Sequence, residues 1–530
     1  MSEQDHFNLY TQPWAPVVRG GRENAVSLRT CILEAHLIDG LSITDGPFFA
    51  GMLRLLVALV MDAYGQPAND EQWAALRAPG RFSDETLDTY VDAVGQASFD
   101  LFDPDYPFMQ SASTPFEDKS VAELLPHVAT GNRTPIWTPD TDSTPRQLTF
   151  AQAARALVAT QAIAVPSPGR AAKDDPQESW AGLSFAGRAG VIGFCCPIGD
   201  TLFETLLLNL PTGAHTARDP EDLPVWRRRD VPASRRKRFA TGMADLLTWT
   251  PRRVRLIPND GTVSRVCFRG GDALPHLARD HEPHTAWRQS DGKSGVPAGT
   301  WYPRKHLPHT IGWRGIPQLL ALGDHSKDSR PPTVIRELGN RLNRLPPNYR
   351  VTIMSMLVTY GNMSAVIDDI STDVYPLPVR AFGEDERDIR DDLVDVVTIA
   401  DQVRYLVRGY ARDVYAVTTR DLEQKRYAAE AFAATVEVQL VSHIDSITRR
   451  LLSDLAAYPD DLRRLIGEWK AALRQLVEET VHGIDADCGA NVFTLLSKDG
   501  KVDIFPPPVR RAQLQQKLIS YLGDINLEAV

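Results

Sequence analysis

Residues 389–414 read IRDDLVDVVTIADQVRYLVRGYARDV, and the spacing of their apolar side chains decides the fold of the C-terminal part of the chain. These side chains follow one another in alternating steps of four and three: Ile389, Leu393, Val396, Ala400, Val403, Val407, Tyr410 and Val414. Such spacing keeps them on one side of an α-helix. The sequence therefore predicts a long amphipathic helix that buries one apolar stripe.

Three further amphipathic segments follow this helix. Their apolar residues predict helices at about 419–447, at about 461–484 and after Pro508. Four such helices with modest connections bury their stripes against one another. At 530 residues the chain also exceeds the usual size of a single core. We expect an α+β protein in which a large mixed α/β domain, residues 1–382, precedes a C-terminal four-helix bundle, residues 383–530.

The sequence before this bundle is irregular and rich in proline and glycine. Apolar runs predict helices at 48–64, 150–164 and 202–210, and extended segments at 10–17 and 254–258. The run at 48–64 contains Arg54 and is too short to span a bilayer, so we interpret it as a buried helix. Long polar loops are expected at 131–143 and 165–182.

The cysteines and the N-terminus point to a reducing compartment. The cysteines are few, odd in number and without a CxxC pair: Cys31, Cys195, Cys196, Cys267 and Cys488. We therefore expect neither a disulfide framework nor a bound metal. The first residues are acidic where a secretory signal would be basic. The sequence thus favours a cytoplasmic protein.

Positive charge is concentrated in one stretch, although the whole chain carries a net charge of −10. The basic residues of this stretch are Arg227, Arg228, Arg229, Arg235, Arg236, Lys237, Arg238, Arg252, Arg253 and Arg255. Only Asp230 and Asp245 oppose them. Two interpretations stay open: a solvated face, or a patch that pairs with phosphate groups.

A search for catalytic groups finds little. His276, His281 and His284 lie close together, but their spacing matches no helical zinc site, and we expect a solvent-exposed polar loop there. Cys195 and Cys196 have apolar neighbours and are expected to be buried thiols. The adjacent acids at 368–369 and 391–392 are interpreted as charges on helices. No nucleophile elbow, P-loop or dinucleotide fingerprint occurs in the sequence.

Three short segments occur in a fixed order. They are Asn8 to Pro16, with the pattern NLY followed by WAP; residues 106–110, YPFMQ; and residues 361–365, GNMSA, which precede the predicted bundle. Together they resemble CasA, the large subunit of the type I-E CRISPR surveillance complex, Cascade. The order, the spacing and the length agree over nearly the whole chain.

This resemblance implies a non-catalytic, cytoplasmic subunit without a cofactor. It would recognise the protospacer-adjacent motif in duplex DNA, promote strand opening and R-loop formation, and recruit the helicase-nuclease that degrades the target. The implied partners are the other Cascade subunits, the 5′ handle of the crRNA, double-stranded target DNA and the helicase-nuclease. Base pairing with the guide would read the long sequence, which leaves a short motif to the protein.

The resemblance also implies site residues. The motif would be read from the minor groove by Gly361, Asn362, Met363, Ser364 and Ala365, with Met363 at the position of the family's glutamine wedge. Other contacts implied by position are Gly169 and Gly182 in a glycine loop, and Arg279 or Lys293 as the counterpart of a lysine finger. The docking loop on the 5′ handle would contain Asn132, Arg133 and Trp137.

Two other classes of protein remain as alternatives. One is a metal-dependent hydrolase that uses His276, His281 and His284. The other is a scaffold whose basic stretch, Arg227 to Arg238, binds an acidic partner protein.

Overall fold

The structure is a computed structural model that describes residues 6–112, 118–130, 141, 143–144, 146–166, 186–213, 219–229, 238–274, 282–293, 297–308, 311–321, 328–346, 349–361, 366–383, 385–418, 422–488, 496–498, 501–504, 506–525 and 527. The chain divides into two compact units. Unit 1 consists of Met1–Val374 and Phe382–Glu384, and unit 2 of Tyr375–Ala381 and Asp385–Val530.

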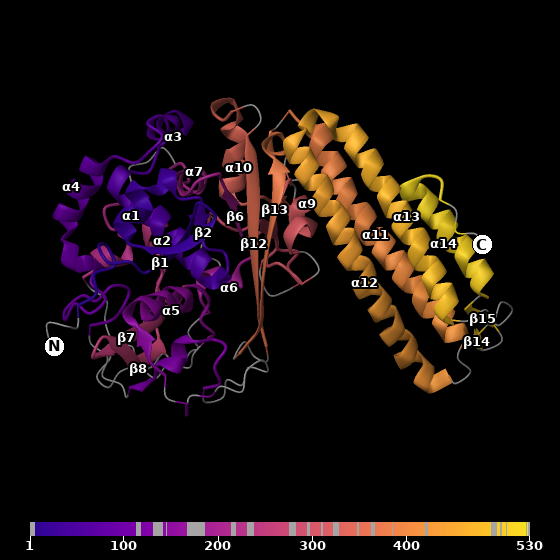
Figure 1. The fold of residues 1–530 in the computed structure, drawn as a ribbon, viewed down its shortest axis with the longest axis horizontal. Coiled ribbons are helices and arrows are strands. Elements are labelled where there is room, and N and C mark those ends of the chain that lie inside the picture. The colour runs from indigo at the N-terminus through magenta and orange to yellow at the C-terminus, as the bar shows by residue number, and fades with distance from the viewer. Residues whose placement is uncertain are drawn as a thin grey trace. The chain divides into compact units, whose positions relative to one another are not determined.

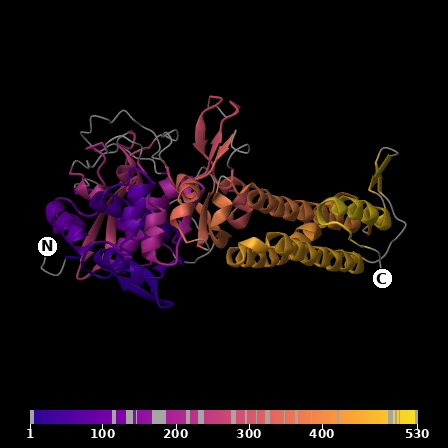
Figure 2. The same cartoon turned by 90° about the horizontal axis from the view of Figure 1, so that it is seen from above.

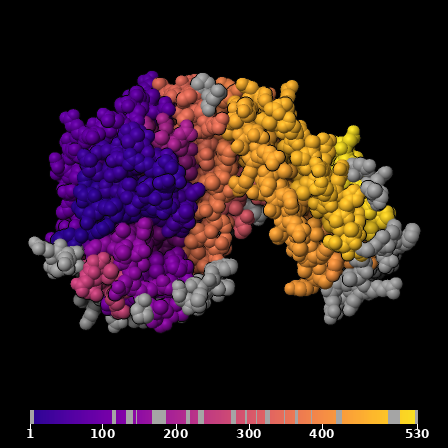
Figure 3. Space-filling model, in the orientation of Figure 1, coloured from indigo at the N-terminus to yellow at the C-terminus, as the bar shows by residue number. Residues whose placement is uncertain are grey.

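Unit 1 mixes helices with small antiparallel sheets (Figure 1). Its described α-helices are α1 (Leu28–Leu33), α2 (Gly46–Tyr64), α3 (Asp70–Arg77), α4 (Asp84–Val94), α5 (Phe150–Ile163), α6 (Arg188–Val191), α7 (Leu202–Leu208), α8 (Met243–Leu247), α9 (Ile316–Leu319) and α10 (Thr333–Asn340). Figure 3 shows its N-terminal residues, in indigo, as a continuous patch on the visible face of the unit.

The strands of unit 1 form four small sheets among the described residues, and the last strand continues into unit 2 at Tyr375. Their bounds are β1 (Ala15–Arg19), β2 (Arg22–Val26), β3 (Gly40–Leu41), β4 (Lys119–Ser120), β5 (Leu148–Thr149), β6 (Phe194–Ile198), β7 (Arg252–Asn259), β8 (Thr262–Gly270), β9 (Trp287–Gln289), β10 (Trp301–Pro303), β11 (Ser329–Arg330), β12 (Arg350–Tyr360) and β13 (Ile367–Pro378). The strand orders are β2-β1-β3, β10-β9-β11, β13-β12-β6 and β4-β8-β5, with β7 paired to β8.

Helix α2 is the core helix of unit 1. Asp45 caps its N-terminus by accepting a hydrogen bond from Phe48 N at 2.9 Å. Its 19 residues are long and apolar enough to cross a membrane, but 83% of the apolar window is buried inside the protein. Gly51 allows α5 to pack closely, because a Cβ there would lie 2.8 Å from Val158. The prediction of a buried helix at 48–64 is confirmed.

Two of the three sequence motifs serve as scaffold. The backbone N–H of Leu9 donates to Phe99 O at 2.9 Å, which ties the N-terminal segment to residues 99–101. Gln110, the last residue of YPFMQ, is buried; its Nε2 donates to Leu101 O at 2.7 Å, and its Oε1 accepts from Leu256 N at 2.8 Å. Each hydrogen bond satisfies a buried backbone group. These hydrogen bonds tie both motifs to the core of unit 1.

The pair Cys195 and Cys196 lies in β6, the strand opposite Ser355 and Met354 of β12. Both thiols are buried, and burial raises the pKa of Cys195 to about 12. None of the five cysteines, which all lie among the described residues, forms a disulfide bond. The prediction that the pair is buried is confirmed, and a protonated thiol is a poor nucleophile.

Unit 2 is dominated by four long helices. They are α11 (Arg387–Thr418), α12 (Leu422–Ala457), α13 (Leu462–Cys488) and α14 (Pro507–Leu522), with a small hairpin of β14 (Leu496–Lys498) and β15 (Lys501–Ile504). Helix α11 packs against the other three, and they run side by side in both views (Figures 1 and 2). All eight apolar residues of the α11 stripe are buried, as predicted. Helix α12 continues ten residues beyond the predicted end at 447.

Candidate nucleic-acid interface

The hairpin of β12 and β13 carries the third sequence motif at its closed end. The N–H of Gly361 donates to Val366 O at 3.0 Å and closes the stem. Glycine lets the Asp368 side chain approach this point, because a Cβ would lie 2.3 Å from its carboxylate oxygen. Asp368 and Asp369 lie on β13, so the prediction that they are helix charges is wrong. Pairing of this segment with β12 decides its conformation.

The stem of the hairpin is anchored on several sides. Strand β12 pairs with β6. At the start of α2, Gly46 makes room for Thr372 of β13; a Cβ there would come within 2.3 Å of Thr372. At the closed end, the Tyr360 hydroxyl donates to Ile163 O, the last residue of α5, at 2.7 Å. Burial raises the pKa of Tyr360, so its hydroxyl stays a donor.

Residues that flank three of the predicted DNA-contact segments meet around α6. Gly187 N donates to Ala164 O at 2.8 Å, which joins the two ends of segment 167–185. Gly190 of α6 has no room for a Cβ, because Tyr360 Oη would lie 2.0 Å away. Arg188 contacts Glu282, which directly follows segment 275–281, at 3.3 Å. Residues far apart in the sequence thus bring these flanks to one region.

A buried ion cluster holds this region together. Glu282 pairs with Arg54 at 2.5 Å and with Arg188 at 3.3 Å, and all three side chains are at most 7% exposed. Burial by itself would raise the pKa of Glu282, but the charge of Arg54 in particular outweighs it and holds this pKa well below its usual range. The carboxylate therefore stays charged and clamps α2 to α6.

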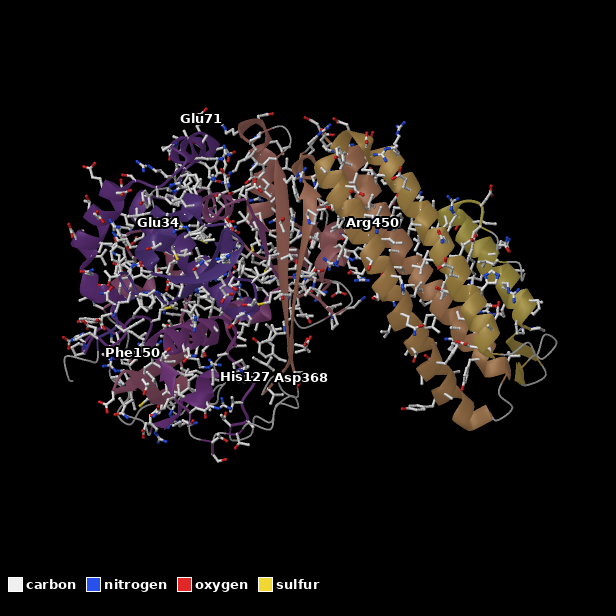
Figure 4. The ribbon with its side chains drawn as sticks, in the orientation of Figure 1. Glu34, Glu71, His127, Phe150, Asp368 and Arg450 are labelled. Atoms are coloured by element: carbon white, nitrogen blue, oxygen red, sulfur yellow. The ribbon has the colours of Figure 1, made fainter. Side chains whose placement is uncertain are left out.

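A groove of about 810 Å³ adjoins the hairpin. It lies between the start of α2, helix α5, residues 124–127 and residues 367–372 of β13. His127 and Asp368, both labelled in Figure 4, line this groove. Asp45, Asp368 and Asp369 share the lining with Arg146, Arg155 and His127. Charges of both signs suit a polar partner better than bare phosphate.

Comparison with known proteins identifies the family. The family model described as CRISPR-associated protein Cse1 matches residues 8–480. The chain belongs to the Cse1 family. It is 33% identical over 300 residues to the CRISPR-associated protein CasA/Cse1 of Thermus thermophilus. That alignment covers 54% of this chain and 56% of the relative, so the chain spans little more than half of that protein's length.

Solved structures of this family share the fold. The crystal structure of Thermobifida fusca Cse1 superimposes with a TM-score of 0.82 at 26% identity, covering 99% of this chain and 100% of that one. A chain in a structure described as a CRISPR RNA-guided surveillance complex has a TM-score of 0.68 at 17% identity, covering 98% and 100%. The latter match shows the fold alone. The mixed fold with a C-terminal helical region is therefore that of Cse1 proteins.

Most residues that the Cse1 resemblance assigned to DNA or RNA lie outside the described residues. This applies to Asn362, Met363, Ser364, Ala365, Gly169, Gly182, Arg279, Asn132, Arg133 and Trp137, and also to His276, His281, Arg235, Arg236 and Lys237. Gly361 closes the hairpin, as described above. Lys293 lies between β9 and β10 with its side chain 88% exposed, 3.6 Å from Asp291.

His284 does not lie in a solvent-exposed loop, so that prediction is wrong for the described residues 282–286, which are buried. Its ring packs against Phe194, with 5.2 Å between the centroids. Burial lowers the pKa of His284, and Arg54 and Arg188 lie beside its neighbour Glu282. Two fixed positive charges oppose a metal cation here, which weakens the hydrolase alternative at this residue.

Two described arginines of the basic stretch, Arg228 and Arg238, are paired with acids inside the protein. Arg238 pairs with Asp245 at 2.5 Å and with Asp272 at 2.7 Å, and Arg228 contacts Asp245 at 3.1 Å. The side chains of Arg228 and Arg238 are only 12% and 20% exposed. A solvated face does not describe these two arginines. We therefore remove them from the candidate phosphate patch and from the patch for an acidic partner.

The remaining described arginines of the stretch are also engaged. Arg227 donates to both carboxylate oxygens of Asp62 at 3.1 and 3.2 Å. Arg229 donates to Ser98 Oγ at 2.7 Å and lies over the Tyr106 ring at 4.5 Å. Arg252 and Arg253 are buried in β7. Sequence reasoning missed the basic surface elsewhere, on β9 and β10, whose only signal was the string WYPRK at 301–305.

Proposed function

We propose that this chain is the large subunit of a type I-E CRISPR Cascade complex. It recognises the protospacer-adjacent motif in target duplex DNA, promotes strand opening and R-loop formation, and recruits the helicase-nuclease for target degradation. Membership of the Cse1 family supports this proposal. So does the likeness of the fold to a chain of an RNA-guided surveillance complex.

One observation carries the proposal of motif recognition. The closed end of the β12–β13 hairpin, which bears residues 362–365, is anchored through Tyr360 beside the flanks of segments 167–185 and 275–281. A short tip on an anchored stem suits the minor groove, where small side chains and amides reach base edges. Apolar insertion by Met363 would unstack a base step and start strand separation.

The subunit acts by binding, without catalysis of its own. Among the described residues, no three histidine, cysteine or acidic groups gather as a metal site would require. Sequence recognition by the guide leaves the protein a short motif to read, a task that needs no nucleophile. We further propose a cytoplasmic location, which suits five cysteines that form no disulfide bond. We also propose docking on the crRNA 5′ handle through the loop of Asn132, Arg133 and Trp137.

The test uses the assembled complex with Asn362→Ala and Met363→Ala combined in this chain. Capture of motif-bearing duplex should weaken, while binding to duplex without the motif and assembly of the complex stay unchanged. A matched control combines Asn24→Ala with Leu37→Ala, two exposed positions of unit 1. Equal capture by the test variant and the control would rule out the hairpin tip as the reader of the motif.

A further inference from the structure

The sheet β10-β9-β11 carries arginines stacked on aromatic rings. Its register places Arg288 of β9 opposite Tyr302 of β10 and Ser329 of β11. The Arg288 guanidinium lies over the Tyr302 ring, 4.5 Å from the centroid, and Arg330 lies over Trp301 at 3.8 Å. Stacking fixes the plane of a guanidinium and leaves the N–H groups at its edge free to bind an anion.

A second arginine lies on the same face as Arg288. Arg304 follows β10, and its N–H donates to Ala286 O at 2.7 Å, which continues the strand pairing by one position. Partial burial, and after it the charge of Arg288, lower the pKa of Arg304. The register places Arg304 two residues beyond Tyr302, the residue opposite Arg288, so two like charges are neighbours on one face. Such charges repel each other until an anion binds between them. No described carboxylate forms an ion pair with Arg288 or Arg304.

The local charge differs from that of the whole chain. Residues 286–305 contain four basic residues, Arg288, Lys293, Arg304 and Lys305, against the single acid Asp291, whereas the chain carries −10. Asp291 lies near Lys293 and leaves the arginines unopposed. The side chains of Arg288 and Lys305 are exposed. This surface is thus positive in a protein that is acidic overall.

The basic surface continues to the closed end of the hairpin. Lys305 Nζ lies 5.8 Å from the centroid of the Tyr360 ring, and Tyr360 directly precedes Gly361. The neighbouring His306 Nε2 contacts Phe194 O at 3.2 Å, and Phe194 pairs with Met356 of β12. Of the residues that follow β10, Lys305 therefore lies beside the end of β12 that leads into the motif loop, and His306 lies against β6.

We propose that Arg288, Arg304 and Lys305 bind the phosphodiester backbone of the target duplex beside the protospacer-adjacent motif. This inference rests on the proposed function, because it places the duplex at the hairpin. Continuity with the hairpin favours target DNA over guide RNA as the source of the phosphates. These residues add affinity that does not depend on base sequence, whereas the hairpin tip discriminates.

The experiment measures the affinity of the assembled complex for short duplexes with and without the motif, at several salt concentrations. The test variant combines Arg288→Gln with Arg304→Gln. The control combines Arg22→Gln with Arg350→Gln, which removes the same charge from exposed positions; Arg350 lies at the opposite end of β12. A second variant, Arg288→Lys with Arg304→Lys, keeps the charge but not the planar guanidinium.

We expect the test variant to lose affinity for both duplexes by the same factor, on the order of tenfold, and the slope of log K against log salt to fall by about two. The lysine variant should keep most of the slope. A test variant that matches the control overturns the inference. The inference is also overturned if the test variant loses crRNA from the complex but keeps its affinity for DNA, because the surface would then bind RNA. Wild-type complex without motif preference would instead refute the proposed function.

Discussion

Two arginine-bearing regions of unit 1 behave in opposite ways. Between residues 226 and 255 the sequence holds ten basic residues and two acids. The described arginines there nevertheless form ion pairs or hydrogen bonds within the protein, or are buried. Between residues 286 and 305 it holds only four basic residues, but Arg288 and Arg304 have aromatic neighbours and no carboxylate partner among the described residues. Local charge density therefore does not predict where free positive charge lies.

Burial explains the difference. The first region forms α8 and β7, which lie in the core, and a buried guanidinium requires a carboxylate because an uncompensated buried charge is very costly. Asp272 meets this requirement for Arg253 and Arg238. In the pair of Arg227 and Asp62 the carboxylate is the buried member, and Arg227 supplies its countercharge. The second region forms a small sheet with one exposed face, where water and a stacked ring are sufficient.

The largest expected effect comes from removing one buried acid. Asp272→Asn leaves the buried Arg253 and Arg238 without this countercharge, and we expect a loss of about 3–5 kcal/mol in the free energy of unfolding. The matched control is Asp291→Asn, because Asp291 and its neighbour Lys293 are both exposed. Tryptophan fluorescence in denaturant measures unit 1, since only Trp469 of the ten tryptophans lies in unit 2. Equal denaturant midpoints for Asp272→Asn and Asp291→Asn would contradict the idea that the arginines of the first region depend on a buried carboxylate.

A pH titration of stability tests whether the buried charge of Glu282 is likewise stabilised by its arginine partners. Its pKa is depressed in the folded protein, chiefly by Arg54 against the opposing effect of burial, and is about 4.3 for an unfolded glutamate. The unfolded state then binds more protons, so this stabilisation is complete above pH 4.3 and is lost as the pH falls toward the folded pKa. We expect Glu282→Gln to be less stable at pH 7 and to lose less further stability on acidification. If the free energy of unfolding depended on pH in the same way in the variant and the wild type, the ion pairs of Glu282 would not hold α2 to α6.

A crossed pair of variants separates the two regions directly. Arg228→Gln with Arg238→Gln should lower the free energy of unfolding by about 1–3 kcal/mol, because hydrogen bonds to charged partners are lost. The salt slope of duplex binding by the complex should stay at the wild-type value. Arg288→Gln with Arg304→Gln should show the reverse pattern. If the first pair also lowered the salt slope, those arginines would contact phosphates after all.

Sequence periodicity predicted the elements that depend on local pattern. The stripe of α11, the buried run of α2 and the thiols of β6 follow from neighbours within a few residues. The site depends on contacts that no local pattern contains: Arg54 and Glu282 are 228 positions apart. Asp368 and Asp369 were assigned to a helix because their place opposite β12 is not visible in the sequence. Strands β9 and β10, with three residues each, are too short to show a period.

The smallest expected effect concerns the ring beneath Arg288. Tyr302→Leu removes the stacking partner but no charge, and an exposed cation–π contact contributes about 0.5–1 kcal/mol. Duplex affinity of the complex should fall by roughly two- to fivefold at an unchanged salt slope, because the number of phosphate contacts stays the same. Tyr302→Phe keeps the ring and should bind like wild type. If Tyr302→Leu also lowered the slope, the ring would do more than orient Arg288, and loss of the phosphate contact itself would follow from losing the stack.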